Sequence, residues 1–593
     1  MYTKIFHFGT EITEHTLFSE ETGYGFVNQE SLPGKTKSEQ SIYSGGWNLR
    51  KNYLEDWKTS LHTRENGVEI TSERFVMIFK ILVPEEGSYQ ITLTSHAGDD
   101  GISDMMLFTG RRNLIESGIQ VAPYESYTKC FIAFTAPYIP ALTNIPCTEK
   151  AIYISLTGKH ACLSEIKIEK KETPVLYIAG DSTLTDQNAL FPYYPYGSCG
   201  GWAQMLAQYF GSVAICNQAH SGMTTNCFRD DGHWNIIKER LKVGDIVVLQ
   251  FGHNDQKRRN LSAFGGYINN LRRYIKEIRV YGAYPVIVSP ISRIPLKDNG
   301  SFHSLLSLYA EACKSVADEC CVPFIDLHEL TFQKWCHLGE EKAQDYFIKG
   351  DITHTNDYGA CLTASYFIKE IKRQHIEPLV TLLTPLPKDT TLFKQDTKEV
   401  PEDPADTGMF EIDIPYIDIE GIPQYHDMIR ALKKGLLDPC VMHLHPTQPI
   451  PRAQFLMVYF KALRMPGKRP YCGSFCDISR YEWDSAYVQA CIEENLIEPV
   501  TVSSDYFRPD DFLTYAEFAS FLIRGMASNS KERNISIDDC FRNAKTLNFI
   551  PHETDRNDFI SRADCYKGLV ILMDTINNTG QSLPSDVEIH PVG

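Results

Sequence analysis

Residues 175–186 read VLYIAGDSTLTD, six apolar or small residues followed by a polar stretch. The first half has the length of a strand that is buried on both faces, and Asp181, Ser182 and Thr183 follow it directly. Open α/β sheets bind their ligands at the carboxyl ends of the strands. A serine at that edge can act as a nucleophile, although the same residues are also compatible with a polar turn or a helix N-cap. The stretch therefore predicts an α/β domain with Ser182 as a candidate catalytic residue.

The chain after this stretch alternates between strand-like and helix-like patterns. Continuous apolar runs of strand length occur at 213–219, 245–252, 284–291 and 322–327. Segments with apolar residues at helical spacing occur between and after them, at 202–210, 267–278, 305–318 and 362–373. Strands that alternate with helices indicate a parallel sheet covered by helices on its faces. We expect this central α/β domain to span residues 172–385.

Two more polar groups follow neighbouring strands of the expected sheet. Gly222 lies in NQAHSGMTT (217–225), and Asn254 lies in FGHNDQ (251–256) beside His253. A glycine can present its backbone N–H without obstruction, and an asparagine side chain supplies an amide donor. Together with the backbone N–H of Ser182 they can form an oxyanion hole, although either residue alone also fits an ordinary turn.

The segment KGDITHTNDYGA (349–360) supplies the remaining candidates just before the last expected helix. Asp351 and His354 are three residues apart, so one short loop can present both on the same side. His354 can accept the proton of Ser182, and Asp351 can orient the imidazole. A helix-capping Asp beside an unrelated surface His is the alternative for this loop by itself.

Aromatic residues gather after the candidate serine in FPYYPYGSCGGW (191–202), and Trp234 follows the Gly222 loop. Their rings can stack on sugar faces, line a pocket for an apolar acyl chain, or pack in the core.

The flanking segments differ from the α/β pattern. Residues 1–171 contain short strand-like runs at 75–83, 89–97, 129–136, 151–158 and 164–171, which indicate an antiparallel β-sandwich. Residues 386–408 are rich in Pro, Asp, Thr and Lys and are expected to be a linker. Residues 409–593 carry a degenerate threefold repeat, in which each copy contains two helical segments. We expect an all-α repeat domain there.

The composition of the chain limits the classes of partner that it can bind. The chain of 593 residues has 58 Lys and Arg against 75 Asp and Glu, which gives a net charge of −17. An acidic surface argues against nucleic acid as a partner, and no apolar run has the length needed for membrane insertion. The 17 cysteines contain no CxxC pair, and the chain opens without a signal-peptide pattern. These two features favour free thiols and a cytoplasmic location, with the cell surface as the alternative if the sequence was trimmed.

Four blocks occur in the order Ser182, Gly222, Asn254 and Asp351-x-x-His354, and together they resemble the SGNH (GDSL) hydrolase superfamily. The motifs GDST, FGHND and DITHTNDYGA are most similar to those of the rhamnogalacturonan acetylesterase group. The resemblance implies a flavodoxin-like α/β/α sheet, a Ser182–His354–Asp351 triad and an oxyanion hole of Ser182, Gly222 and Asn254. It implies no metal and no cofactor. The segment 6–26 resembles the galactose-binding-like β-sandwich that precedes some of these esterases.

The repeats of residues 409–593 resemble S-layer homology repeats. The resemblance rests on Asp418 and Asp477, on Trp483, and on the Arg-Ala pairs at 452–453 and 562–563, with Tyr515 in place of the expected Arg in the second copy. It implies cell-wall polysaccharide as a second partner, and a purely structural helical domain is the alternative.

These features together predict a serine esterase that removes O-acetyl groups from plant cell-wall polysaccharide or its oligosaccharides, specifically pectic rhamnogalacturonan. One alternative is a different carbohydrate acetylesterase, such as an acetylxylan type, or a short-chain esterase. The alternative from another class is a glycan-binding protein in which the esterase domain is secondary.

Overall fold

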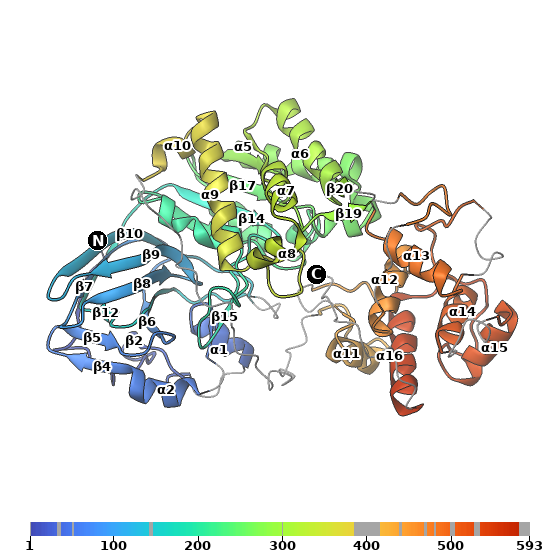
Figure 1. Cartoon of the computed structure of the whole chain (residues 1–593), viewed down its shortest axis with the longest axis horizontal. Coiled ribbons are helices and arrows are strands. Elements are labelled where there is room, and N and C mark those ends of the chain that lie inside the picture. Colours follow the sequence, from blue (N-terminus) through green and yellow to red (C-terminus); the bar gives the residue numbers. More distant parts are fainter. Residues whose placement is uncertain are drawn as a thin grey trace.

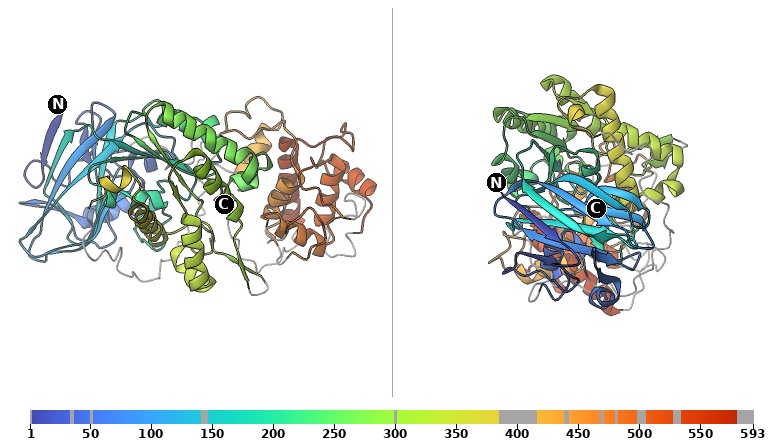
Figure 2. Two further views of the ribbon diagram at one scale, coloured as in Figure 1. Left: turned by 90° about the horizontal axis from the view of Figure 1, so that it is seen from above. Right: turned by 90° about the vertical axis from the view of Figure 1, so that its left-hand side faces the viewer.

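The computed structural model describes residues 2–32, 37–49, 52–140, 146–298, 301–384, 416–437, 442–465, 467, 471–479, 482–497, 505–526 and 534–579. Three bodies follow one another along the chain: β-strands, then an α/β body, then helices (Figure 1). Figure 2 shows the α/β body between the other two. The expected linker 386–408 lies outside the described residues. The exact domain boundaries of the sequence analysis stay predictions.

The N-terminal body consists of antiparallel sheets in the orders β1-β13-β7-β10, β2-β6-β11-β8-β9 and β12-β5-β4. The strands are β1 (Thr3–His7), β2 (Tyr24–Phe26), β4 (Leu61–Arg64), β5 (Gly67–Ile70), β6 (Val76–Leu82), β7 (Gly87–His96), β8 (Ile102–Thr109), β9 (Asn113–Val121), β10 (Ser126–Thr135), β11 (Ala151–Thr157), β12 (Cys162–Leu163) and β13 (Glu165–Lys170). Two short helices, α1 (Lys37–Tyr43) and α2 (Tyr53–Ser60), accompany them. That these sheets form a galactose-binding-like sandwich stays a prediction.

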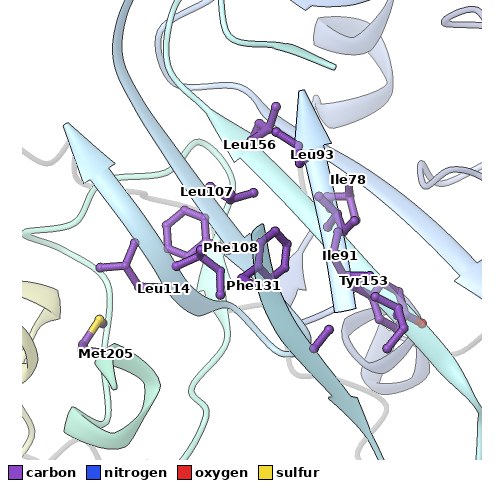
Figure 3. Packing of buried hydrophobic residues seen from close by; sticks show 14 of the residues in the cluster. Ile78, Ile91, Leu93, Leu107, Phe108, Leu114, Phe131, Tyr153, Leu156 and Met205 are labelled. Carbon is purple, nitrogen blue, oxygen red and sulfur yellow. The ribbon is translucent and has the colours of Figure 1, made fainter. Parts of the chain in front are cut away.

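Buried side chains from the two larger sheets belong to one hydrophobic cluster. Figure 3 shows Ile91 and Phe131 of the first sheet together with Phe108 and Leu114 of the second. Met205 of the α/β body belongs to the same cluster. The short strands β3 (Trp47–Asn48) and β15 (Ala189–Leu190) also pair in parallel across the two bodies. The N-terminal strands therefore pack against the α/β body through a shared core.

The α/β body is built on a five-stranded parallel sheet in the order β16-β14-β17-β18-β21. Its elements are β14 (Val175–Gly180), β16 (Ala214–Asn217), β17 (Ile246–Gln250), β18 (Tyr284–Val288), β21 (Phe324–Ile325), α3 (Cys227–Asp230), α4 (His233–Lys238), α5 (Ile268–Val280), α6 (Ser307–Cys320), α7 (Leu327–Leu338), α8 (Glu340–Ala343), α9 (Asp357–Gln374) and α10 (Leu379–Leu382), with the hairpin β19 (Leu296–Asp298) and β20 (Ser301–His303). The first strand lies between the second and the third, so the strand order reverses at β14. Ligands bind at the carboxyl end of such a switch point, where Ser182 lies. The central parallel sheet of the sequence analysis is confirmed.

The expected helix over 202–210 is wrong. Trp202–Met205 and Ala207–Tyr209 form two separate 3₁₀ turns instead. Trp202, Ala203, Gln204 and Met205 are all buried, so burial is not confined to the single face that a helical period describes. The amide of Gln204 donates hydrogen bonds to the carbonyls of Arg111 and Gln187, which fixes the turn between two other segments.

The C-terminal body is helical, as expected. Its helices are α11 (Tyr425–Lys433), α12 (Arg452–Ala462), α13 (Ser485–Glu493), α14 (Tyr515–Met526), α15 (Ile537–Thr546) and α16 (Arg562–Thr579). Gly435, Asn495 and Asn548 all take positive φ, at 74°, 52° and 58°, after the first helix of each pair. Left-handed residues end helices in this way, so the repeated sequence positions are repeated helix stops. None of the helices in the described ranges is long and apolar enough to cross a membrane.

The two repeated aspartates have the same structural role. Asp418 accepts hydrogen bonds from the backbone N–H groups of Leu444 and His445. Asp477 accepts them from Phe507 and Arg508, at 2.8 and 2.6 Å. In each copy the carboxylate thus fastens the loop that leads toward the second helix.

Candidate active site

Ser182 lies just after the carboxyl end of β14, an interior strand of the parallel sheet that lies between β16 and β17. All six residues of β14 are buried, and Ser182 itself is 8% exposed. The turn after the strand is closed by Asp181, whose Oδ1 accepts hydrogen bonds from the backbone N–H and the hydroxyl of Thr183, at 3.0 and 2.8 Å. The strand and this Asx turn hold the serine at the sheet edge.

His354 and Asp351 reach the serine from the loop before α9. The distance from His354 Nε2 to Ser182 Oγ is 2.9 Å, and His354 Nδ1 lies 2.7 Å from Asp351 Oδ2. Asp351 Oδ1 accepts the backbone N–H groups of Thr353 and His354, which makes the loop a tight Asx turn. Asn356 then caps α9 by accepting the N–H of Gly359. The spacing of three residues therefore places Asp351 and His354 side by side, and the helix begins directly after them.

This geometry determines which ring nitrogen of His354 faces Ser182. Because Asp351 accepts the Nδ1–H of His354, Nε2 is left with the lone pair that can accept the Ser182 proton. Burial by itself would raise the pKa of Asp351, but the hydrogen bond and charge of His354, with the two backbone N–H groups, hold that pKa below its usual value. Asp351 is therefore a carboxylate at neutral pH and can stabilise a cationic imidazole.

The structure brings the Gly222 loop and Asn254 together beside β14. Asn254 Nδ2 donates to the carbonyl of Met223 at 3.1 Å, which leaves the second N–H of the amide as a further donor. Gly222 has a φ of 79°, a left-handed conformation that suits glycine. The backbone N–H of His220 donates to the carbonyl of Gly180, so this loop is fastened to the strand that carries Ser182.

A buried aspartate–histidine pair beneath the serine was not assigned a role from the sequence. His253 Nδ1 lies 3.2 Å from Asp181 Oδ2, and the two side chains are 2% and 0% exposed. Asp181 precedes Ser182, and His253 precedes Asn254, so the pair joins the two strand ends. Burial, reinforced by the nearby charges of Arg293 and His354, lowers the pKa of His253 despite the opposing effect of Asp181. The imidazole is therefore neutral and donates from Nδ1.

The hydrogen bonds continue behind this pair into the core. Gln250 Nε2 donates to Thr183 Oγ1 at 2.9 Å, and Trp202 Nε1 donates to Gln250 Oε1 at 3.1 Å. Trp202 donates to Gln250, Gln250 donates to Thr183, and Thr183 donates to Asp181. Each of these side chains therefore has a hydrogen-bond partner. The only sequence signal for it was the presence of polar residues inside apolar strand runs.

Most of the aromatic residues singled out in the sequence pack in the core, whereas Tyr194 and Tyr196 are partly buried. Trp234 is 1% exposed, and its Nε1 donates to Glu277 Oε2 at 2.6 Å. Tyr193 is 2% exposed, and its hydroxyl donates to Asp357 Oδ2 at 2.6 Å. Of the alternatives for these two rings, the structure favours core packing.

A serine bonded to a His–Asp pair, at the switch point of a parallel α/β sheet, is the arrangement of a serine hydrolase. Within the described ranges, His, Cys, Asp and Glu side chains form no group of three that could hold a metal ion. The chemistry that this arrangement can perform is nucleophilic acyl transfer by a side-chain oxygen.

Comparison with known proteins identifies the family. Residues 178–361 match the model of the GDSL-like lipase/acylhydrolase family. The rhamnogalacturonan acetylesterase RhgT of Bacillus subtilis (strain 168) is 33% identical over 174 residues, which are 29% of this chain and 73% of that protein. The probable rhamnogalacturonan acetylesterase YesY of the same organism is 31% identical over 206 residues, 33% of this chain and 92% of that protein. The chain belongs to the GDSL-like lipase/acylhydrolase family and is a carboxylic ester hydrolase.

A crystal structure of the Bacillus subtilis protein YxiM is also similar, with 21% identity, 63% of this chain and 99% of that chain covered, and a TM-score of 0.34.

The C-terminal helices include a second known domain. Residues 474–519 match the S-layer homology domain. The expectation of a cytoplasmic protein is therefore wrong, because an S-layer homology domain points to a cell-surface or cell-wall-associated protein. The cysteines misled the inference for a physical reason. Cys162, Cys313, Cys361 and Cys491 are buried, where a thiol serves as a small apolar side chain in any compartment.

Proposed function

We propose that the chain is a serine esterase that removes O-acetyl groups from pectic rhamnogalacturonan or its oligosaccharides, with Ser182, His354 and Asp351 as the catalytic residues. The observation that carries the proposal is the 2.9 Å distance between His354 Nε2 and Ser182 Oγ. Geometry of this kind lets the imidazole act as the general base for the serine.

In the first half-reaction His354 Nε2 takes the proton of Ser182 as Oγ attacks the acetyl carbonyl carbon. Collapse of the tetrahedral intermediate breaks the bond to the sugar oxygen, which receives the proton from His354. In the second half-reaction water attacks the acetyl-serine and gives its proton to His354. Collapse of the second tetrahedral intermediate breaks the bond to Ser182 Oγ, which receives the proton from His354, and acetic acid leaves and gives its own proton to the solvent. Asp351 stabilises the imidazolium in both halves.

The oxyanion formed in each half-reaction needs donors at the same place. We assign this role to the backbone N–H groups of Ser182 and Gly222 and to the side-chain amide of Asn254. The hydrogen bond from Asn254 to the Met223 carbonyl supports this assignment, because it joins the asparagine to the glycine loop. Donors that are fixed before the reaction stabilise the developing charge most effectively.

The substrate class rests on the relatives. The two Bacillus subtilis proteins are named a rhamnogalacturonan acetylesterase and a probable rhamnogalacturonan acetylesterase. The match to the family model, over residues 178–361, includes all five proposed site residues. A different carbohydrate acetylesterase, such as an acetylxylan type, or a short-chain esterase, is the alternative within the same chemistry. The test is acetate release from acetylated rhamnogalacturonan, xylan and mannan oligosaccharides. A rate on xylan above that on rhamnogalacturonan would reject the pectic substrate.

The catalytic assignment is tested separately with a small aryl acetate. We expect Ser182→Ala to lower kcat by more than about 10⁴-fold, because the nucleophile is removed while the fold is kept. Ser307→Ala is the matched control, since Ser307 is exposed at the start of α6. Equal activity of the two variants would reject Ser182 as the nucleophile.

We further propose that the C-terminal helices attach the enzyme to cell-wall polysaccharide. The match to an S-layer homology domain supports this role. The helices also carry a hollow of about 630 Å³, lined by Thr447, Pro449, Tyr515, Glu553, Thr554, Asp558 and Phe559. Phe559 is 57% exposed and forms an edge contact with the exposed Phe512. Carboxylates and exposed rings are groups that bind sugar hydroxyls and sugar faces.

The alternative hypothesis is a glycan-binding protein in which the esterase domain is secondary. Release of acetate from the acetylated oligosaccharides would reject it.

A further inference from the structure

Two adjacent arginines in the turn between β8 and β9 reach from the N-terminal sheets into the α/β body. Arg112 is completely buried, and its φ of 61° lies in the left-handed region, which turns its side chain away from the line of the strands. The side chain of Arg111 is 15% exposed. A buried guanidinium requires compensating acceptors, and all of those named below belong to the α/β body.

Arg112 bonds to three segments at once. Nη1 donates to Asp357 Oδ2 at 2.6 Å, and both of these side chains are 0% exposed. Nη2 donates to the carbonyl of Cys199 at 2.6 Å, and Nε donates to the carbonyl of Gln187 at 3.2 Å. The planar fork of an arginine is suited to such a fixed set of acceptors.

Two of these acceptors lie next to the residues assigned to catalysis. Gln187 donates from Nε2 to the backbone carbonyl of Ser182 at 2.9 Å. Asp357 lies in the first turn of α9, three residues after His354. Arg112 is thus connected to Ser182 through the hydrogen bonds of Gln187. It is connected to His354 through Asp357 and the tight turn between these two residues.

Arg111 fastens the loop after the serine from the other side. Its Nη2 donates to the carbonyl of Asn217 at 2.7 Å and lies 3.3 Å from Asp186 Oδ2. Asp186 also accepts Asn113 Nδ2 at 3.1 Å and Asn217 Nδ2 at 2.7 Å. The loop from Ser182 to Gln187 is therefore held between the β8–β9 turn and the end of β16.

We propose that Arg112, supported by Arg111, is a positioning residue for hydrolysis: it sets the distance between the Ser182 segment and the His354 segment. The inference rests on the proposed function. It assigns the N-terminal sheets a part in catalysis, because the turn that they supply completes the support of the triad. A displacement of about 1 Å in reacting groups can lower a rate by about 100-fold, so a small shift of either segment is enough.

Removing Arg112 would also leave a charge without compensation. Burial raises the pKa of Asp357, and the charge and hydrogen bond of Arg112 oppose that rise. Without the arginine, Asp357 must take up a proton or draw water into the core, and either change moves the start of α9.

The experiment measures kcat and KM for an aryl acetate in the full-length Arg112→Lys and Arg112→Met variants, below the unfolding midpoint of each. Lysine keeps the charge, but its compact ammonium cannot reach three acceptors that are spread around the planar guanidinium. We therefore expect kcat to fall at least fivefold in Arg112→Lys and further in Arg112→Met. KM should stay within twofold, because Arg112 does not touch the substrate. The rate at which a fluorophosphonate labels Ser182 should fall in parallel with kcat, since labelling also depends on the Ser182–His354 geometry.

Lys80→Met is the matched control for a lost buried ion pair. Lys80 is 1% exposed and bonds to Glu149 at 2.5 Å within the N-terminal body. This variant should lose stability but keep its kcat and labelling rate. If folded Arg112→Lys keeps more than a fifth of the wild-type kcat, or if Lys80→Met loses as much activity as Arg112→Lys, the proposal is overturned. Should Arg112→Met fail to fold, Arg112→Lys alone decides. An inactive wild-type enzyme would instead reject the proposed function, so the two failures are distinguishable.

Discussion

His354 Nε2 and Ser182 Oγ lie 2.9 Å apart although 172 residues separate them in the sequence. The contact exists because β14 ends at the carboxyl edge of the sheet and the loop before α9 returns to the same edge. Everything proposed about catalysis depends on this distance, and the bond between His354 and Asp351 makes it directional.

Asp351→Asn tests that direction. An asparagine in this position can donate its amide to Nδ1, which favours the tautomer that carries its proton on Nε2 and cannot accept one from Ser182. We expect kcat for an aryl acetate to fall by roughly 10⁴-fold at neutral pH, the size of the effect of the equivalent change in a serine protease. Asp318→Asn, on the exposed side of α6, is the control. A loss smaller than tenfold would show that Asp351 does not orient the base.

Asp255→Asn tests the electrostatics beside the site. Burial, with a smaller contribution from the charge of Asp181, raises the pKa of Asp255 to about 7, against the lowering effect of hydrogen bonds from Thr225. A carboxyl with a raised folded-state pKa binds its proton more tightly in the folded chain. The free energy of unfolding therefore falls as the pH rises from about 4 to about 7, by as much as about 4 kcal/mol.

The asparagine cannot ionise, so the variant should be more stable than the wild type at pH 8, and this gain should vanish near pH 4. Urea unfolding of both proteins at pH 4, 6 and 8 measures the effect. Parallel stability curves across this range would contradict the raised pKa.

Trp234→Ala separates core packing from sugar binding. Because the ring is 1% exposed and meets Tyr274 edge-on at 4.9 Å, its loss should lower the free energy of unfolding by about 3–5 kcal/mol. KM for acetylated oligosaccharides should stay within twofold at a temperature where the variant is folded. A KM raised tenfold, with little change in stability, would restore Trp234 as a substrate-stacking residue.

Phe559→Ala tests the hollow in the C-terminal helices. Removal of one exposed ring from a glycan site should weaken binding of the intact chain to isolated bacterial cell walls by about tenfold, close to 1.4 kcal/mol. Leu547→Ala removes a residue that is 43% exposed and does not line the hollow, and it should bind like the wild type. Sedimentation with the walls gives the bound fraction. Equal binding of the two variants would place wall attachment elsewhere.

Local sequence patterns predicted those elements whose formation depends on one strand or one turn alone. The runs at 175–180 and 245–252 contain β14 (Val175–Gly180) and β17 (Ile246–Gln250), because a strand buried on both faces leaves a continuous apolar stretch. The helix expected at 362–373 became α9, which begins at Asp357, five residues earlier, because Asn356 caps it. The helix expected over 202–210 did not form, and the four consecutive residues 202–205 are all buried rather than only those along one face.

The candidate site divides in the same way. The residue types, their order and their places after strands were enough to nominate Ser182, Gly222, Asn254, Asp351 and His354, since strand ends in a parallel sheet share one edge. The sequence shows Asp181 and His253 only as two polar residues. A hydrogen bond between the ends of two strands does not fix the number of residues that separates its partners, so no motif marks the pair.

The sequence by itself determined the α/β class, the threefold helical repeat and the residues that carry the proposed chemistry, because strand burial, helix stops and motif order are local properties. Only the tertiary structure decided that Trp234 packs in the core and that Arg112 enters the α/β body to meet Asp357, 245 residues further along the chain. A buried ion pair between distant segments is set by how whole sheets pack. No local pattern of residues encodes that packing.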